Sequence, residues 1–338
     1  MAQLQRFLVL AAIAAGICPL IAAPVQIKLA TVVPATSPWH KALLEMGKAW
    51  DEGTAGRVRL TVYPGSADTE ATILTQMRPA FEQYQASYMS NIGLTGIDDA
   101  FSVLGIPFFF ESDEEVRAVQ QKLAPLLEQR LQARGLHLLA WGTGGWVQLF
   151  SKQPLHTLAD VKKAKLFTSK GNTRWVSWYL KNGFHPVELV PASIPEQLKL
   201  SPGLIDTALY VPWLASNYQV FRDARYMLEL PVAPLSGALI VSSAAWERIP
   251  SADRVMITAA AAALEEKVFR DVPKGDAEAI RSMAARGLTA IAVGARAADE
   301  FRSAGEQLQT SIRGDIVPAD VFDLAVQARD RVRKHTGK

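Results

Sequence analysis

The pattern of apolar and polar positions at the beginning of the chain predicts strands that alternate with helices. Gln26–Val33 and Arg57–Tyr63 alternate between the two kinds of residue and are rich in β-branched side chains, as strands are. Between them, apolar residues recur at helical spacing from Trp39 to Glu52. A further helix is predicted over Glu70–Tyr84 and a further strand over Gln85–Ile92. This order is typical of an open α/β sheet.

A second alternation begins in the middle of the chain, around a Gly-rich turn predicted at Gly142–Gly145. Leu136–Trp141 is predicted to be a strand that leads into this turn, and Val147–Ser151 a strand that leaves it. Further strands are predicted over 165–168, 186–190 and 204–210, and helices over 173–182 and 194–200. Pro234–Val241 is predicted to return as a strand to the first part of the fold. We therefore expect two α/β lobes with a cleft between them.

The last third of the chain is predicted to be mostly helical. Asp253–Arg270 is rich in alanine and other helix-forming residues, and the last helices are expected over 297–313 and 318–333. Proline is expected to kink or break a helix, because it lacks a backbone N–H and collides with the preceding turn. We therefore expect interruptions at Pro273, and near Pro125 within the helical segment 113–134.

The length of 338 residues favours two domains, because a domain usually has about 100–200 residues. From the order of the elements we place the first lobe at 25–147 together with about 235–268. The second lobe is placed at 148–234 together with about 269–338, which includes the C-terminal helices.

Residues 1–23 have the features of a secretory signal peptide. Arg6 precedes an apolar run over 7–17, and small residues follow it. The run is shorter than the ~20 residues that span a membrane, and no second run follows, so a permanent anchor is not expected. Cys18 is the only cysteine, and its surroundings match a lipoprotein box poorly. We predict an exported, periplasmic protein, and leave its cleavage site and lipidation open.

Composition and motifs argue against several classes of function. The 36 basic and 33 acidic residues leave a net charge of +3, so nothing favours a nucleic-acid-binding protein. The five histidines have no spacing suited to metal ligation, and no phosphate-binding loop, dinucleotide fingerprint or nucleophile elbow occurs. We therefore predict no metal, no cofactor and no enzyme activity.

Seven motifs follow one another along the chain: Ser37–His40, Tyr63–Gly65, Ile106–Phe110, Ser151–Leu155, Leu158–Val161 with Lys165-Leu166, Gly203–Asp206, and Ala245–Pro250. In this order they resemble the DctP-like substrate-binding proteins of TRAP transporters. The resemblance implies an α/β fold of the two-lobe periplasmic-binding-protein type, with a central cleft and a helical C-terminal region. It also implies a protein that closes on a small organic solute and delivers it to a small and a large membrane subunit, which use an ion gradient.

Many members of this family bind organic acids through an arginine in a Lys-[Ile/Leu]-Arg motif, and often through a second one at the start of the preceding strand. Here Phe167 and Trp146 stand at these two positions. A buried carboxylate needs a cation or several hydrogen bonds, and aromatic rings offer stacking or cation–π contacts instead. We therefore expect a solute that is less acidic or more hydrophobic than a C4-dicarboxylate.

Candidate ligand contacts are taken from these two positions, from nearby aromatic residues and from the ends of the predicted strands, where open sheets bind ligands. They are Trp39, His40, Glu70, Asn91, Trp146, Phe167, Arg174, Tyr210 and Trp213. Arg174 or Lys170 could replace the missing arginine. For each residue the alternative is a role in packing, capping or the solvated surface. For the whole protein the alternatives are a binding protein with an accessory or sensor partner, or an enzyme on the same fold.

Overall fold

The computed structural model describes residues 23–67, 69–170, 173–190 and 193–336. The predicted signal peptide, with Cys18, lies outside the described residues except for Ala23. The strands are β1 Val25–Thr31, β2 Val58–Pro64, β3 Ala86–Ser90, β4 Leu136–Ser151, β5 Lys165–Ser169, β6 His185–Leu189, β7 Thr207–Tyr210, β8 Tyr226–Leu228, β9 Ala233–Ser242 and β10 Thr289–Ile291.

The α-helices are α2 Pro38–Gly53, α3 Glu70–Met77, α4 Asn91–Thr95, α5 Asp113–Gln132, α6 Leu158–Lys163, α7 Thr173–Lys181, α8 Ile194–Lys199, α9 Pro212–Asn217, α10 Ser243–Arg248, α11 Ser251–Ala284, α12 Ala295–Ile312 and α13 Ala319–Thr336. Within the described ranges, short 3₁₀ helices include η1 Asp99–Gly105 and η3 Val220–Arg222. The predicted alternation of strands and helices is confirmed in both halves of the chain.

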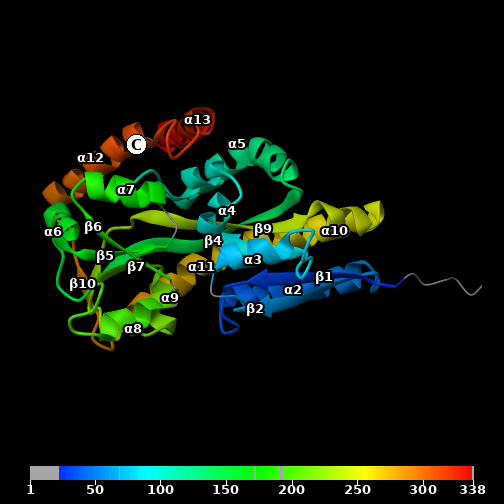
Figure 1. Ribbon diagram of the computed structural model, residues 1–338, viewed down its shortest axis with the longest axis horizontal. Helices are drawn as coiled ribbons and strands as arrows, with labels where there is room; N and C mark the ends of the chain where they lie inside the picture. The colour runs from blue at the N-terminus through cyan, green and yellow to red at the C-terminus, as the bar shows by residue number, and fades with distance from the viewer. Residues whose placement is uncertain (1–22, 68, 171–172, 191–192, 337–338) are drawn as a thin grey trace, which may run out of the picture.

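The strands lie in the order β2-β1-β3-β9-β4-β7-β5-β6, with β8 paired to β4 and to β10 (Figure 1). Neighbouring strands within β2-β1-β3 and within β7-β5-β6 are parallel. The three pairs between these groups, β3 with β9, β9 with β4 and β4 with β7, are antiparallel. We call the part around β2-β1-β3 the first lobe and the part around β7-β5-β6 the second lobe. As predicted, β9 returns to the first lobe and pairs with β3.

Strand β4 connects the two lobes, and here the prediction of two strands separated by a turn was wrong. Its first part pairs with β9, and Gln148–Ser151 pairs with β7. The register shifts between Thr143 and Trp146, so this stretch of β4 has one residue more than its partner in β9. Gly145 has a φ of +96°, which an L side chain rarely adopts. The glycines therefore form a β-bulge inside one long strand.

Each lobe has its own hydrophobic core. The large core of the first lobe combines β1, β3 and β9 with α2, α5 and α11. Helix α2 shows how the sequence builds it: Ser37 caps the helix by accepting a hydrogen bond from His40 N, and the helix buries Trp39, Met46 and Trp50 on one face. The sheet of the second lobe has a core on each of its two faces, one around Phe150 and Phe221 and the other around Leu166 and Phe301.

The helix breaks expected at Pro125 and Pro273 do not occur. Helix α5 continues through Pro125 and α11 through Pro273. A proline removes one hydrogen bond from a helix, but burial of the apolar face on either side can outweigh that loss. Helix α5 buries Leu123 and Leu127 around its proline. None of the helices in the described ranges has the length and apolarity needed to cross a membrane.

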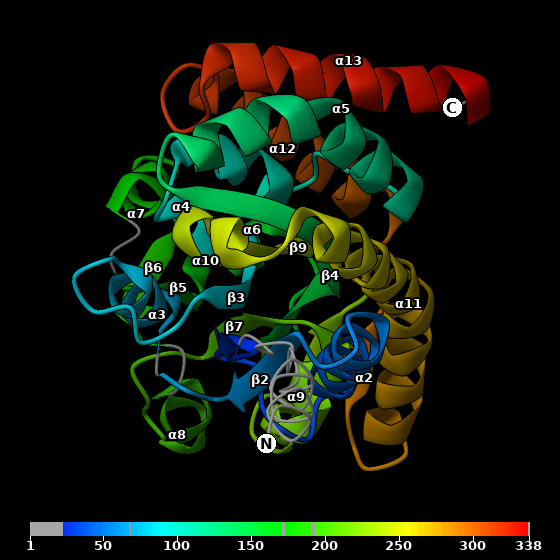
Figure 2. The ribbon, with the colours of Figure 1, turned by 90° about the vertical axis from the view of Figure 1, so that its right-hand side faces the viewer.

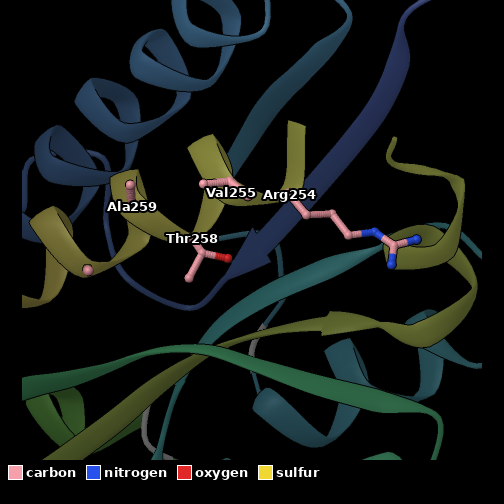
Figure 3. Close-up of a pocket in the computed structure, with 5 residues that line it drawn as sticks. Arg254, Val255, Thr258 and Ala259 are labelled. Carbon is pink, nitrogen blue, oxygen red and sulfur yellow. The ribbon is translucent and has the colours of Figure 1, made fainter. Parts of the chain in front are cut away.

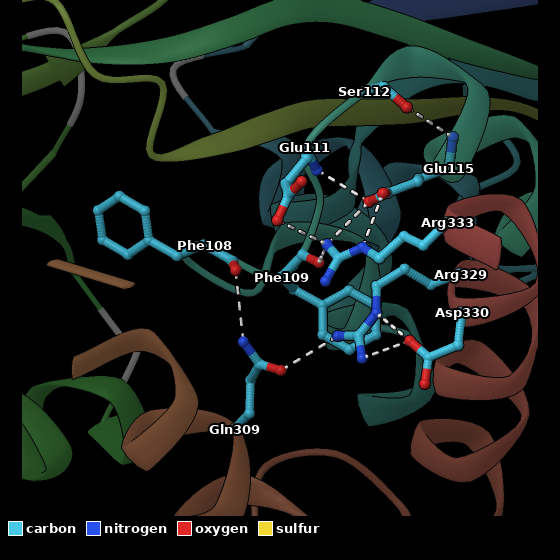
Figure 4. A network of polar contacts seen from close by, with 9 residues as sticks. All are labelled: Phe108, Phe109, Glu111, Ser112, Glu115, Gln309, Arg329, Asp330 and Arg333. Carbon is cyan, nitrogen blue, oxygen red and sulfur yellow. Dashed lines mark hydrogen bonds and ion pairs between the residues drawn. The ribbon is translucent and has the colours of Figure 1, made fainter. Parts of the chain in front are cut away.

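The C-terminal helix α13 lies along α5 of the first lobe (Figure 2). Arg333 near its end donates to both carboxylate oxygens of Glu115, at 2.8 and 3.1 Å, and to the carbonyl of Phe109 at 3.2 Å (Figure 4). Arg329, one turn earlier, lies over the ring of Phe109. The predicted division of the chain into lobes stays a prediction, but these contacts fasten α13 to the first lobe.

Candidate functional site

Two tryptophans from different lobes contact each other where the lobes meet. Trp39 stands in the first turn of α2, and Trp213 in the first turn of α9. Their rings meet edge to face, with centroids 5.1 Å apart and planes at 87°. Trp39 Nε1 also donates to the carbonyl of Thr143 on β4, at 2.8 Å. Helix α2 is therefore joined to both the connecting strand and the second lobe.

A buried carboxylate lies behind these rings. Asp276 of α11 accepts a hydrogen bond from the backbone N–H of Trp213 at 3.0 Å, and it also accepts from the backbone N–H of Trp146. Burial raises the pKa of the Asp276 carboxyl to about 7, the negative charge of Asp113 adds to the rise, and the two N–H groups oppose it. We call Trp39, Thr143, Trp146, Trp213 and Asp276 the crossing cluster.

Trp146 is the member of this cluster that reaches toward α5. Its indole Nε1 donates to Oδ1 of Asp113, the first residue of α5, at 2.9 Å. Of the nine predicted contacts, the structure therefore brings Trp39, Trp146 and Trp213 together around the bulge of β4. Whether they contact a solute stays a prediction.

Phe167 and Tyr210 lie together elsewhere. Both belong to one core of the second lobe, with 9% and 6% of their surfaces exposed. Burial raises the pKa of the Tyr210 hydroxyl. The position at which the family often has an arginine is thus filled by a ring that packs among the apolar side chains of its own lobe.

Glu70 and Asn91 lie near the end of β3. Glu70 accepts hydrogen bonds from the backbone N and the hydroxyl of Ser90, at 2.6 and 2.7 Å, and burial raises the pKa of its carboxyl. Asn91 is buried, and its Oδ1 has no hydrogen-bond partner among the described residues. Glu70 therefore joins α3 to the junction between β3 and α4, while Asn91 has a free acceptor among the described residues.

Among the described residues, the basic candidates form no hydrogen bond or ion pair with the crossing cluster. Arg174 of α7 pairs with Asp99 of η1 at 2.8 Å and donates to the carbonyl of Asp315 at 3.0 Å. It therefore joins the second lobe to η1 and to the loop before α13. Lys170 is exposed. His40 is partly buried, and its Nδ1 has no partner among the described residues.

Two hollows lie on the surface, away from the crossing cluster. One, of about 480 Å³, runs along the first turns of α11 beside Val255, Thr258 and Ala259 (Figure 3). The other, of about 590 Å³, lies between α6, α7 and α12 and is lined by Lys162, Trp178 and Phe184, among others. Trp39 and Trp213 touch directly, so a solute can enter between them only if the lobes separate.

Asp276, Asp113 and Thr143 were not among the residues predicted from the sequence. For Asp276 a signal was present, because it stands on the helical stripe formed by Val272, Ala279 and Met283, where an apolar residue is expected. For Asp113 and Thr143 there was none, because their partners are far away in the sequence.

A family model and known proteins with similar sequences indicate the family of this chain. The family model described as "Bacterial extracellular solute-binding protein, family 7" (DctP) matches residues 29–313. A protein of Haemophilus influenzae described only as uncharacterized is 23% identical over 244 residues, which cover 71% of this chain and 73% of that protein.

Solved structures with the same fold include a TRAP periplasmic solute-binding protein from Haemophilus influenzae with bound L-gulonate. It is 21% identical, with a TM-score of 0.79, covering 91% of this chain and 99% of the other. Another is an extracytoplasmic solute receptor of Bordetella pertussis that binds pyroglutamic acid, 19% identical, with a TM-score of 0.81 and coverage of 90% and 99%.

These similarities confirm the predicted two-lobe α/β fold with a helical C-terminal region. The matched family is one of solute-binding proteins and not of enzymes. Because its model spans most of the sequence, the chain belongs to the DctP family, the bacterial extracellular solute-binding proteins of family 7 that the motif order had predicted.

Proposed function

We propose that this protein is the periplasmic component of a TRAP-type transporter, which captures a small organic solute and delivers it to membrane subunits driven by an ion gradient. Family membership supports a solute-binding role. The signal-peptide pattern of residues 1–23 supports export. The proteins with bound L-gulonate and pyroglutamic acid support a small organic acid or a related molecule as the solute.

The solute is less acidic or more hydrophobic than a C4-dicarboxylate. The observation that carries this proposal is the make-up of the crossing cluster, which joins three indole rings to a carboxylate. Phe167 and Trp146 stand at the two positions where members of the family often have an arginine, and Arg174 is paired with Asp99. A dianion brought to Asp276 would meet negative charge instead of a cation, which is unfavourable in a buried place.

Solute entry requires Trp39 and Trp213 to separate. An edge-to-face aromatic pair contributes only about 0.5–1.5 kcal/mol beyond its buried area. A solute that offers each ring an equal or better contact can therefore replace the pair. The protein then exchanges between an open and a closed state, and the solute shifts the equilibrium toward the closed state because that state binds the solute more tightly.

A panel of acids tests the solute class directly. The purified protein is freed of any bound molecule by unfolding and refolding, and its affinity for succinate, malate, phenylacetate and octanoate is measured by calorimetry. We expect phenylacetate or octanoate to bind more tightly than either dicarboxylate. Tight binding of succinate or malate, with no binding of the other two, would overturn the proposed solute class while leaving the solute-binding role intact. Native mass spectrometry of the protein as isolated identifies a solute outside the panel.

The Trp213→Ala variant tests the place of binding. We expect its affinity for phenylacetate to fall about tenfold, because a stacked aromatic contact contributes on the order of 1 kcal/mol or more. Trp246→Ala is the matched control, since Trp246 lies on α10 beside His137 and Arg254, away from the crossing cluster. Equal affinities of the two folded variants would remove Trp213 from the binding site.

A further inference from the structure

Asp276 and Asp113 both accept hydrogen bonds from Trp146. Asp276 lies in the half of α11 that packs against α9, and it accepts from the backbone N–H of Trp146. Asp113 begins α5, in the first lobe, and it accepts from the indole N–H of the same tryptophan. Two carboxylates from different parts of the fold are therefore brought toward each other across Trp146.

No cation balances this pair within the described residues, since neither carboxylate takes part in an ion pair there. Helix α9, with the sequence PWLASN, has no charged side chain, and strand β4 has none over Trp141–Ser151. On α11 itself, Lys274 and Glu278 are exposed. On α2, Lys41 and Glu45 are exposed, and on α5 Arg117 pairs with Glu266. The charge that acts on Asp276 is thus that of Asp113, and it is repulsive.

In this structure the first lobe covers the place where Asp276 lies. Asp276 binds the backbone of Trp213, and the ring of Trp213 is covered by Trp39 of α2. Separation of the lobes would remove Trp39 and Asp113 together, which would admit water to Asp276 and relieve the repulsion. Both changes favour the ionised carboxylate in the open state.

We propose that Asp276, with Asp113 across Trp146, is a proton-sensitive switch of lobe closure: the lobes close over a protonated Asp276 and loosen when it is ionised. This inference goes beyond the proposed function, and its test requires no solute.

The direction follows from linkage. In the closed structure the pKa of Asp276 is about 7, whereas a hydrated aspartate has a pKa of about 4. The closed state therefore binds more protons than the open one between about pH 4 and pH 7. Closure is favoured as the pH falls through this window, by up to about tenfold per pH unit, and the effect is absent above about pH 7.

The experiment measures the distance between the lobes without solute. Spin labels are attached at Leu44→Cys on α2 and at Leu200→Cys after α8, two exposed positions, in a Cys18→Ser background. Pulsed electron paramagnetic resonance then gives the fraction of closed molecules from pH 4.5 to 8. Burial also raises the pKa values of Glu70 and Glu265, so variants are needed to assign the titration.

We expect the closed fraction of the parent protein to rise as the pH falls below 7. Asp276→Asn, which mimics the protonated side chain, should stay largely closed at every pH. Asp113→Asn keeps an acceptor for Trp146 and removes the repulsive charge, so its transition should begin at a lower pH. Asp271→Asn is the control: the Arg270 guanidinium lowers the pKa of Asp271, and its variant should follow the parent.

The proposal is overturned if the closed fraction of the parent does not depend on pH, or if Asp276→Asn keeps the dependence of the parent. Should Asp276→Asn fail to fold, an Asp113→Asn profile identical to that of the parent would overturn it in the same way. If the parent protein bound none of the acids in the panel but its closed fraction still depended on pH, only the proposed function would be contradicted.

Discussion

Replacing Arg333 by alanine should lower the free energy of unfolding by about 3 kcal/mol, because it leaves the carboxylate of Glu115 buried without a cation. The Glu115 side chain is 3% exposed, and its oxygens accept from Arg333 Nε and Nη2 at 2.8 and 3.1 Å. Glu115 also accepts from the backbone N of Glu111, and this single bond cannot balance the buried charge. Urea-induced unfolding, followed by circular dichroism, measures the loss.

Arg313→Ala is the matched control for this prediction. Arg313, at the end of α12, forms a bidentate ion pair with Asp323 of α13, with N–O distances of 2.7 and 2.6 Å. Both of these side chains are about half exposed, so water replaces the lost partner and the loss of stability should be much smaller. If both variants lost the same free energy, burial of Glu115 would not be the cause. A double variant Glu115→Gln with Arg333→Ala should regain part of the loss, because no charge is then left in the interior.

The order of the elements could be predicted because it depends on local patterns. Gln26–Val33 alternates between apolar and polar residues, and the structure places β1 there; the helical spacing that begins at Trp39 corresponds to α2. The motif Ile106–Phe110 and its companions led to the family for the same reason, since each is short and continuous in the sequence.

The connecting strand could not be predicted in the same way, because a bulge depends on the partner strand. Gly142–Gly145 has the composition of a turn, and only the pairing of Thr143 with Ser236 and of Trp146 with Pro234 makes it part of β4. The continuity of α5 and α11 through their prolines depends on tertiary packing too. Local propensity was overridden in each case by contacts made far away in the sequence.

The candidate site was predicted only in part for a related reason. Trp39 could be selected from a strand end, Trp146 from a motif position and Trp213 from the nearby aromatic residues, and they do lie together. The sequence does not show that Phe167 belongs to the core and not to the crossing cluster. Strand β5 is buried on both faces, so its pattern of apolar residues does not tell which face a side chain occupies. Asp276 has a local signal in its place on an apolar helical stripe, but its partners, Trp146 and Trp213, belong to other elements and cannot be read from that stripe.

Replacing Gly145 by alanine should lower the free energy of unfolding by about 3 kcal/mol and disturb the crossing cluster. Two effects combine. An alanine at a φ of +96° costs about 1–2 kcal/mol in backbone strain. Its Cβ would also overlap Oδ2 of Asp276, so the carboxylate would have to move away from the N–H groups of Trp146 and Trp213, at a further cost of about 1–2 kcal/mol.

Gly287→Ala separates these two effects. Gly287 has a similar φ of +105°, and a Cβ there would meet no atom within 4 Å. This variant should therefore lose only the strain, about 1–2 kcal/mol, and its near-ultraviolet circular dichroism, which reports on the packing of tryptophan rings, should match the parent. Gly145→Ala should change that spectrum and also shift the pH at which the lobes close, because Asp276 would be displaced and more hydrated. Equal losses of stability and unchanged spectra in both variants would mean that the bulge of β4 tolerates a side chain, and that Asp276 does not depend on the close approach of the Gly145 backbone.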